Sequence, residues 1–245
     1  MAGCNYSMTV GDTDGVPLAQ LDMSGTPPEG IVLAGPDRII ISDGEILAIN
    51  VSGDAEAVEL LRFNLEDGKL GIMRENGNWR DTGTAIVRVT MPSPRGITLA
   101  GSGNIEAASL SGDATEATIA GSGALRIARL TTGALDLNIM GSGAFAAAGN
   151  AERLDMNIAG SGSSKMRDLR VGDAEISIAG SGDGEFASDG TVEANIAGSG
   201  TVTVHGRAAC TVNAMGSGKV ICRDDARAET GARAAPSETE AGAGD

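Results

Sequence analysis

The chain of 245 residues has 33 Asp and Glu against 18 Lys and Arg, which gives it a net charge of −15 at pH 7. This balance argues against nucleic acid or an anionic membrane surface as a partner, because both bind to basic protein surfaces. No apolar run approaches the roughly 18 residues that a membrane-spanning helix needs, so no membrane span is predicted.

Residues 1–29 are rich in Gly, Asp and Thr and are predicted to be loosely ordered. They contain Cys4, which follows a Met-Ala-Gly start. In bacterial lipoproteins a pair of small residues such as Ala-Gly precedes the lipidated Cys, after a charged and apolar leader. Such a signal sequence is absent before Cys4 in this chain. Cys4 is therefore either the candidate lipid anchor of a truncated sequence or a plain exposed thiol.

Short apolar segments separated by Gly and Asp follow between residues 30 and 91. The predicted strands are Arg38–Ser42, Glu45–Val51, Val58–Phe63, Lys69–Met73 and Ala85–Met91. They are expected to form irregular first coils of the repetitive body that begins at residue 92. The terminal units of a repeat protein are usually atypical, because they are exposed and must be capped.

The tripeptide Gly-Ser-Gly occurs seven times between residues 92 and 223. The copies begin at Gly101, Gly121, Gly141, Gly160, Gly180, Gly198 and Gly216, so successive copies lie 18 to 20 residues apart. A fixed period of this size is typical of a solenoid, in which each unit buries its apolar face only against its neighbours. Residues 30–223 are therefore predicted to form one domain, with irregular coils over 30–91 and regular coils over 92–223.

Apolar and polar residues alternate on both sides of each triplet. The second residue before it is Leu99, Ile119, Ile139, Ile158, Ile178, Ile196 and Ala214. Alternation with a period of two predicts strands with one buried face. The triplet between two strands predicts a tight corner, because Gly accepts a positive φ and a close backbone approach. Its Ser is expected to hydrogen-bond a neighbouring corner.

Two topologies fit this pattern: a parallel β-helix in which each unit is one coil, and an antiparallel meander, sandwich or barrel. A coil stacks equivalent residues on each other at about 4.8 Å. A meander gives no reason for an Ile column at one place in every unit. The predicted fold class is therefore all-β, a parallel β-helix (solenoid) with coils of about 20 residues and Gly-Ser-Gly corners.

The end of the chain has a different composition. Residues 224–245 consist mostly of Ala, Gly, Glu, Asp, Arg, Thr and Ser and show no apolar periodicity. They are predicted to form a disordered acidic tail.

Two of the three cysteines lie in the last regular coil. Cys210 and Cys222 flank the final corner, and the alternation turns both inward. Inward residues on facing walls of a narrow coil can reach the Cα separation that a disulfide needs. In an oxidising compartment we predict a disulfide that caps the last coil. The alternative is two buried free thiols, since Cys is a common core residue.

Acidic residues stand five positions before five of the corners and face outward: Glu116, Asp136, Asp155, Glu175 and Glu193. In a β-helix they stack about 4.8 Å apart, and Ca²⁺, which prefers oxygen ligands, would relieve their repulsion. They are a candidate cation column. The alternative is a solubilising stripe, which the absence of a Gly-Gly-x-Gly-x-Asp calcium repeat favours.

A second outward column stands three positions before each corner and consists of Thr98, Thr118, Asn138, Asn157, Ser177, Asn195 and Asn213. Such a polar ladder can hydrogen-bond along the solenoid axis and hold the register of the coils. The functional alternative is a flat ligand face for a glycan or ice.

The residue types for catalysis are scarce. His205 is the only His and is expected to be an ordinary surface residue. With a single His, the sequence offers few ligands for a metal cluster and few partners for a Ser-His or Cys-His catalytic pair. Aromatic residues make up 2% of the chain, which leaves few platforms for sugar stacking in a β-helical lyase or hydrolase. No catalytic residues and no cofactors are predicted.

Strands in the first third, followed by seven Gly-Ser-Gly corners, resemble the putative auto-transporter adhesin head domain family of bacterial envelope proteins, also called the GIN domain family. The likeness includes the phrase Asn-Ile-Ala-Gly-Ser-Gly at 157–162 and 195–200 and covers about residues 31–222. The resemblance implies a right-handed β-helix in a secreted or envelope-anchored protein, periplasmic or surface-exposed. It implies no catalytic motif.

These observations lead to the hypothesis of a non-enzymatic cell-envelope protein that acts in adhesion or as a surface scaffold through an elongated β-helix. Two alternatives remain. One is a carbohydrate-binding or carbohydrate-cleaving β-helix, and the other is a Ca-dependent binding module that uses the acidic column. The hypothesis leaves open the surface ligand or protein partner and the oligomeric state.

Overall fold

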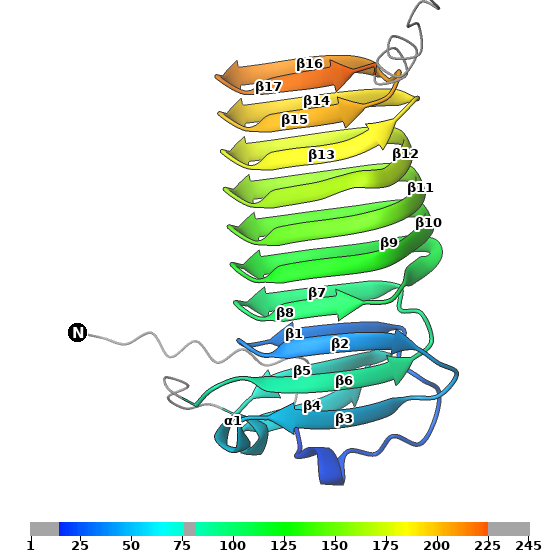
Figure 1. The fold of residues 1–245 in the computed structure, drawn as a ribbon, viewed down its shortest axis with the longest axis vertical. Coiled ribbons are helices and arrows are strands. Elements are labelled where there is room, and N and C mark those ends of the chain that lie inside the picture. The colour runs from blue at the N-terminus through cyan, green and yellow to red at the C-terminus, as the bar shows by residue number, and fades with distance from the viewer. Residues whose placement is uncertain (1–14, 76–81, 225–245) are drawn as a thin grey trace, which may run out of the picture.

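The computed structural model describes residues 15–75 and 82–224. All its strands belong to one 17-stranded sheet, wound into a parallel β-helix whose rungs stack in a column (Figure 1). Helical turns in these ranges are a 3₁₀ turn at Leu18–Gln20 and α1 at Ala55–Glu59. The predicted fold class, an all-β parallel solenoid with coils of about 20 residues, is confirmed.

The regular part of the solenoid begins at residue 96. Its strands are β7 (Gly96–Gly101), β8 (Asn104–Ala107), β9 (Leu110–Gly121), β10 (Ala124–Gly141), β11 (Ala144–Gly160), β12 (Ser163–Gly180), β13 (Asp183–Ser188), β14 (Thr191–Gly198), β15 (Thr201–His205), β16 (Ala209–Gly216) and β17 (Lys219–Arg223). Strands one unit apart pair in parallel, and their register places Ile119, Ile139, Ile158, Ile178 and Ile196 in one column. This pairing excludes the antiparallel meander for these strands.

Three strands are longer than the sequence pattern predicts. β10, β11 and β12 have 18, 17 and 18 residues, and each curves through a bend that lies between two successive Gly-Ser-Gly corners. The register shifts there, between Ile127 and Leu130 on β10. Gly149 of β11 lies at this bend with a φ of 133°, and a Cβ on it would be 2.0 Å from the carbonyl oxygen of Leu130. Glycine thus lets the strand bend while it continues to pair.

The first rungs have a more complex order than a simple succession of coils. Their strands are β1 (Gly30–Ala34), β2 (Arg38–Asp43), β3 (Ala48–Gly53), β4 (Leu61–Glu66), β5 (Lys69–Arg74) and β6 (Ala85–Met91). The rung formed by β1 and β2 lies between β5–β6 on one side and β7–β8 on the other. β3 and β4 pair antiparallel with β6 and β5 and, together with α1, close this end of the solenoid (Figure 1).

Two predicted strands in this region differ from the structure. The predicted strand Val58–Phe63 is divided between α1 and β4, and the strand predicted from Glu45 begins only at Ala48. The sequence Ala-Glu-Ala-Val-Glu of α1 contains strong helix formers. This local preference outweighs the apolar alternation that favoured a strand.

The segment before β1 also differs in part from the predicted loose order of residues 1–29. Val16 forms an antiparallel bridge with Phe63, with two backbone hydrogen bonds of 2.8 Å. This bridge attaches the segment to the outer edge of β4. Residues 1–14, and residues 225–245 of the predicted tail, lie outside the described residues.

The core is a narrow column of inward side chains. Phe63, Phe145 and Phe186 are fully buried, as are the Ile column and, in the first rungs, Leu33 and Leu70. Small residues such as Ala117 and Ala194 face inward at other positions of the same walls. Each large aliphatic or aromatic side chain buried in this way contributes about 1.5–3 kcal/mol.

The seven predicted corners all show the geometry that requires glycine. The first Gly of each triplet has a positive φ, between 117° at Gly141 and 136° at Gly198. From the second corner on, the Ser of the triplet donates its backbone N–H to the first Gly of the corner one rung before, as from Ser122 to Gly101 O at 3.0 Å. The predicted contact between corners therefore runs through the backbone of the Ser.

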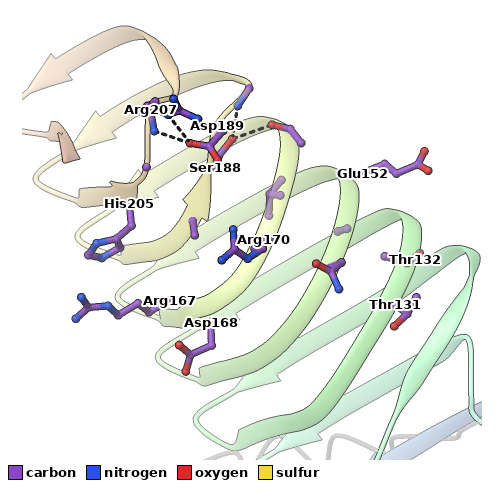
Figure 2. A pocket seen from close by; sticks show the side chains of 17 residues that line it. Thr131, Thr132, Glu152, Arg167, Asp168, Arg170, Ser188, Asp189, His205 and Arg207 are labelled. Atoms are coloured by element: carbon purple, nitrogen blue, oxygen red, sulfur yellow. Dashed lines mark hydrogen bonds and ion pairs between the residues drawn. The ribbon is translucent and has the colours of Figure 1, made fainter. Parts of the chain in front are cut away.

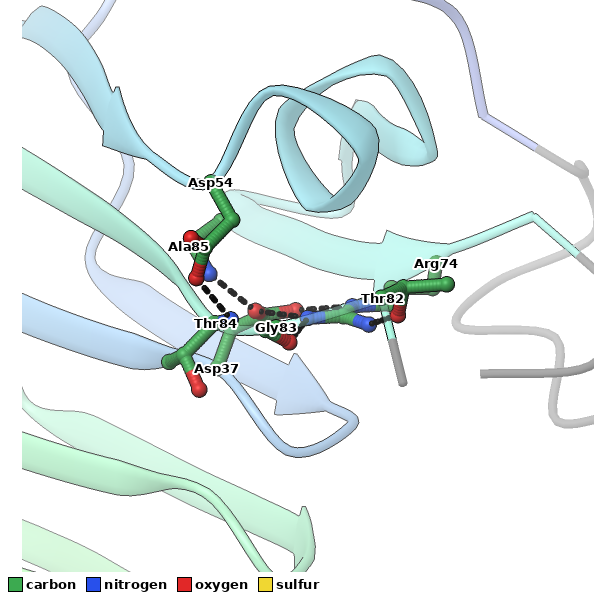
Figure 3. A network of polar contacts seen from close by, with 7 residues as sticks. All are labelled: Asp37, Asp54, Arg74, Thr82, Gly83, Thr84 and Ala85. Atoms are coloured by element: carbon green, nitrogen blue, oxygen red, sulfur yellow. Dashed lines mark hydrogen bonds and ion pairs between the residues drawn. The ribbon is translucent and has the colours of Figure 1, made fainter. Parts of the chain in front are cut away.

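A buried ion pair links the rung of β1 and β2 to the neighbouring strands β5 and β6 (Figure 3). Arg74 of β5 donates from Nε and one terminal nitrogen to the two carboxylate oxygens of Asp37, at 2.7 and 2.5 Å. Asp37 also accepts the backbone N–H of Ala85, and Arg74 donates to the Thr82 hydroxyl and the Gly83 carbonyl. Asp37 is 1% exposed. The charges are compensated on several sides, as a buried pair requires.

Candidate functional site

The wall of the solenoid steps inward between β12 and β13. Met166 pairs with Phe186, but the next partners are Arg170 and Ala187, so Arg167–Leu169 have no partner on β13. The corners from Gly180 onward are 18 residues apart instead of 19 or 20, and the shorter perimeter cannot follow the curve of β12. The step leaves a hollow of about 1260 Å³, which we call the notch (Figure 2).

The notch is polar and carries charges of both signs. Its side chains come from β10, β11, β12, β13 and β15 and from the turns that follow β13 and β15 (Figure 2). The charged and hydrogen-bonding residues that line it are Thr131, Thr132, Asn150, Glu152, Arg167, Asp168, Arg170, Ser188, Asp189, His205 and Arg207. Within the described residues, neither Arg167 nor Arg170 forms an ion pair. Their guanidinium groups are exposed and can donate to a ligand.

Asp189 shapes one edge of the notch. Its carboxylate accepts the backbone N–H of Arg207 at 2.9 Å, and the Arg207 Nε lies 3.6 Å away. The hydrogen bond from the Arg207 backbone, together with the positive charges of Arg207 and Arg170, lowers the pKa of Asp189 from its usual value. Asp189 therefore stays ionised at neutral pH and holds the turn that carries Arg207.

The predicted surface position of His205 is wrong. The residue is 6% exposed, and its Nε2 lies 2.9 Å from Oε1 of Glu185. It ends β15, where its register partners are Ala187 on β13 and Arg223 on β17. His205 lies against the notch, and its ring is held by a carboxylate.

Hydroxyl, amide, carboxylate and guanidinium groups side by side can exchange hydrogen bonds with a ligand rich in hydroxyl groups. The lining has no Phe, Tyr, Trp or Cys. The sequence analysis did not identify Arg167, Arg170 or Arg207. The available signal was the shortening of the repeat from 20 to 18 residues at Gly180, which marks the step.

The cysteine pair lies at the opposite end from α1. Cys210 on β16 and Cys222 on β17 are joined in a disulfide, with their Cα atoms 6.9 Å apart. Cys210 is half-buried and packs against the core. The disulfide links the two edge strands of the last described rung, where the sequence places a cap. Cys4 lies outside the described residues.

The acidic column stacks in the predicted register. Glu116, Asp136, Asp155, Glu175 and Glu193 are direct partners on successive rungs, and all are exposed. Three of them accept a hydrogen bond from the polar column two residues on: Glu116 from Thr118, Asp136 from Asn138 and Asp155 from Asn157, at 3.1, 2.6 and 2.9 Å. No three His, Cys, Asp or Glu side chains in the described part of the chain converge on a metal-sized point.

The polar column bonds along the solenoid axis at its last rung. Asn213 Nδ2 donates to Asn195 Oδ1 on the strand before it, at 3.1 Å. Earlier in the column the side chains of Thr118, Asn138 and Asn157 turn along their own strands to the acidic residues. The backbone pairing therefore holds the register over most of the column.

The fold and the notch define a class: a parallel β-helix with a polar hollow on its flank. No helix among the described residues is long and apolar enough to cross a membrane. The chain belongs to the family described as "Putative auto-transporter adhesin, head GIN domain", whose model matches residues 27–208. The family predicted from the Gly-Ser-Gly corners is confirmed. No curated protein matches the chain.

Solved structures share the fold at low sequence identity. A "putative adhesin" from Bacteroides fragilis is 19% identical and superposes with a TM-score of 0.73 over 81% of this chain and 93% of its own. A "Putative lipid binding protein" from Parabacteroides distasonis is 20% identical, with a TM-score of 0.61 over 81% and 94%. A "putative adhesin" from Parabacteroides merdae is 20% identical, with a TM-score of 0.60 over 81% and 92%.

Proposed function

We propose that this protein is a non-enzymatic cell-envelope protein that acts in adhesion and holds a glycan of the opposing surface in the notch. The observation that carries the proposal is the notch itself, a hollow of about 1260 Å³ with unpaired guanidinium groups and hydroxyl and amide donors along one flank. The family description and the names of the structural neighbours support the adhesive role.

The charge of the lining favours a saccharide over a purely anionic ligand. Arg167, Arg170 and Arg207 are balanced by Glu152, Asp168 and Asp189. A lining of both signs donates to and accepts from the same hydroxyl groups, whereas a phosphate or nucleic acid would be repelled by the three carboxylates. This distinguishes the notch from a basic patch.

A carbohydrate-cleaving activity is the less favoured alternative. Glycoside hydrolysis uses two carboxyl groups placed on either side of the scissile bond. Of the three lining carboxylates, Asp189 is held by Arg207, which leaves Glu152 and Asp168. We propose binding without turnover, and an assay of reducing ends released from each bound polysaccharide separates the two.

The direct test is an array of purified oligosaccharides and polysaccharides probed with the full chain. The variant Arg167→Ala/Arg170→Ala removes the two unpaired guanidinium groups, and each lost charged hydrogen bond should weaken binding about tenfold or more. Arg126→Ala/Lys165→Ala is the matched control. These two exposed residues lie in one column of the wall, on either side of Ala146, and neither lines the notch. Equal loss of binding in both variants, or no glycan bound by the parent chain, contradicts the proposal.

The envelope location is the second part of the proposal. Cys4 is the proposed lipid anchor, and the Cys210–Cys222 pair suits an oxidising compartment. We expect the protein, expressed from its full gene, to fractionate with membranes and the variant Cys4→Ser to be released in soluble form. A parent protein that fractionates in soluble form would contradict the proposed lipid anchor and would not bear on the proposal that the notch binds a glycan.

A further inference from the structure

The two ends of the solenoid differ in how they are finished. At the first end β3, β4 and α1 cover the core (Figure 1). At the other end, β16 pairs only with β14 and β17 only with β15 among the described residues. The last rung therefore presents a sheet edge, and the core behind it is open.

The open rung exposes side chains that are buried one rung earlier. Val212 is 42% exposed, whereas its register partner Ala194 is fully buried. Ala214 and Cys222 are exposed, although their partners Ile196 and Val204 are buried. This end is an unpartnered apolar surface framed by two strands.

The edge also has free backbone groups. The N–H of Ala209 bonds back to Gly190 on the previous rung, at 2.8 Å. Because neighbouring residues of a strand point their N–H groups to opposite sides, Cys210, Val212 and Ala214 direct theirs to the open side. Natural edges are usually protected by charged side chains, Pro or a bulge. β16 has none of these: the acidic column ends at Glu193, and Thr211 takes the next position.

We propose that this end docks a second copy of the same chain, tail to tail, through β16 and β17. A two-fold axis across the solenoid sets the edge strands of two copies antiparallel, a pairing that sheets accommodate readily. Head-to-tail growth into a filament is blocked, because β3, β4 and α1 cover the other end. The chain continues from this end as residues 225–245, but these contain no Leu, Ile, Val, Met or aromatic residue to fill the open core.

Dimerisation goes beyond the proposed adhesive function and does not depend on it. If both hold, one particle carries two notches at its two flanks. Two linked sites bind a repetitive surface more tightly than one, by avidity alone.

Sedimentation velocity of the full chain under non-reducing conditions tests the proposal. We expect a mass twice the 24.5 kDa of one chain. Val212→Lys places a charge on the open end and should weaken self-association at least tenfold. Met140→Lys is the matched control, because Met140 is 50% exposed in the middle of a wall, and this variant should remain dimeric. Ala214→Lys repeats the test at an exposed small residue in case Val212→Lys does not fold, as judged by its far-ultraviolet circular dichroism.

Three outcomes would overturn the proposal. One is a monomeric parent chain at its highest soluble concentration. Another is a dimer that persists in folded Val212→Lys and Ala214→Lys variants. The third is a full-length monomer that dimerises once the chain is ended at Asp224, which would make residues 225–245 the occupant of this end.

Discussion

The two glycines of each corner are required for different reasons. The first has a positive φ, and its α-carbon faces the corner of the rung before: a Cβ on Gly141 would lie 2.6 Å from the carbonyl oxygen of Gly121. The second points into the core: a Cβ on Gly143 would lie 2.5 Å from Cγ2 of Ile119. The Ser between them is exposed at all seven corners, and its side chain does not account for the shape of the corner.

Gly141→Ala should therefore destabilise the protein by about 2–4 kcal/mol, since backbone strain and a backbone clash each cost about 1–3 kcal/mol. Gly96→Ala is the control, because a Cβ there meets nothing within 4 Å and Gly96 has no positive φ. Urea unfolding of both variants measures the difference. Equal stability of the two would show that the corner tolerates a side chain and that another feature selects glycine.

At the scale of single elements, the sequence predicts what repeats and misses what occurs once. The triplet spacing and the alternating Ile positions predict the rungs, their register and the inward column, because each follows from contacts between equivalent residues. The helix Ala55–Glu59 and the bend at Gly149 are local exceptions within that pattern. The notch needs side chains from five successive rungs and a change of two residues in the period, which no single motif reveals.

The acidic column is an element whose charges can be tested one at a time. Glu175 has acidic partners on both sides, Asp155 and Glu193, whereas Glu193 has Glu175 on one side and Thr211 on the other. Like charges on neighbouring rungs repel by up to about 1 kcal/mol in solvent. Glu175→Gln should raise the melting temperature at low salt, and Glu193→Gln should raise it by about half as much.

High salt should remove both gains by screening. The same melts with millimolar Ca²⁺ decide between a solubilising stripe and a cation column. For the stripe we expect no shift in the parent protein. A rise with Ca²⁺ that Glu175→Gln abolishes would support the cation column instead.

At the scale of the whole molecule, the path of the chain through the first rungs could not be predicted. The rung of β1 and β2 is held between β5–β6 and β7–β8, which are 26 or more residues away in sequence. Asp37 and Arg74 fix this arrangement, and their pairing depends on tertiary contacts alone. Nothing in the local pattern of residues 30–91 distinguishes this order from a simple succession of coils.

The solenoid has one closed end and one open end, so its stability should not be uniform. In a repeat protein each rung is held by its neighbours, and a terminal rung opens more easily than an internal one. At protein concentrations low enough to keep the chain monomeric, amide hydrogen exchange should be fastest in β16 and β17 and slowest in β9–β11.

The disulfide between Cys210 and Cys222 restrains the opening of the last rung. The oxidised protein should weigh two hydrogens less than the reduced one, and its peptides should contain the link between Cys210 and Cys222. Reduction should then speed exchange in β16 and β17 by up to about a hundredfold, from a loop-closure contribution of up to about 3 kcal/mol, and leave β9–β11 unchanged. Exchange at one common rate in all strands would mean that the molecule unfolds as a single unit. Free thiols at Cys210 and Cys222 in the exported protein would contradict the disulfide.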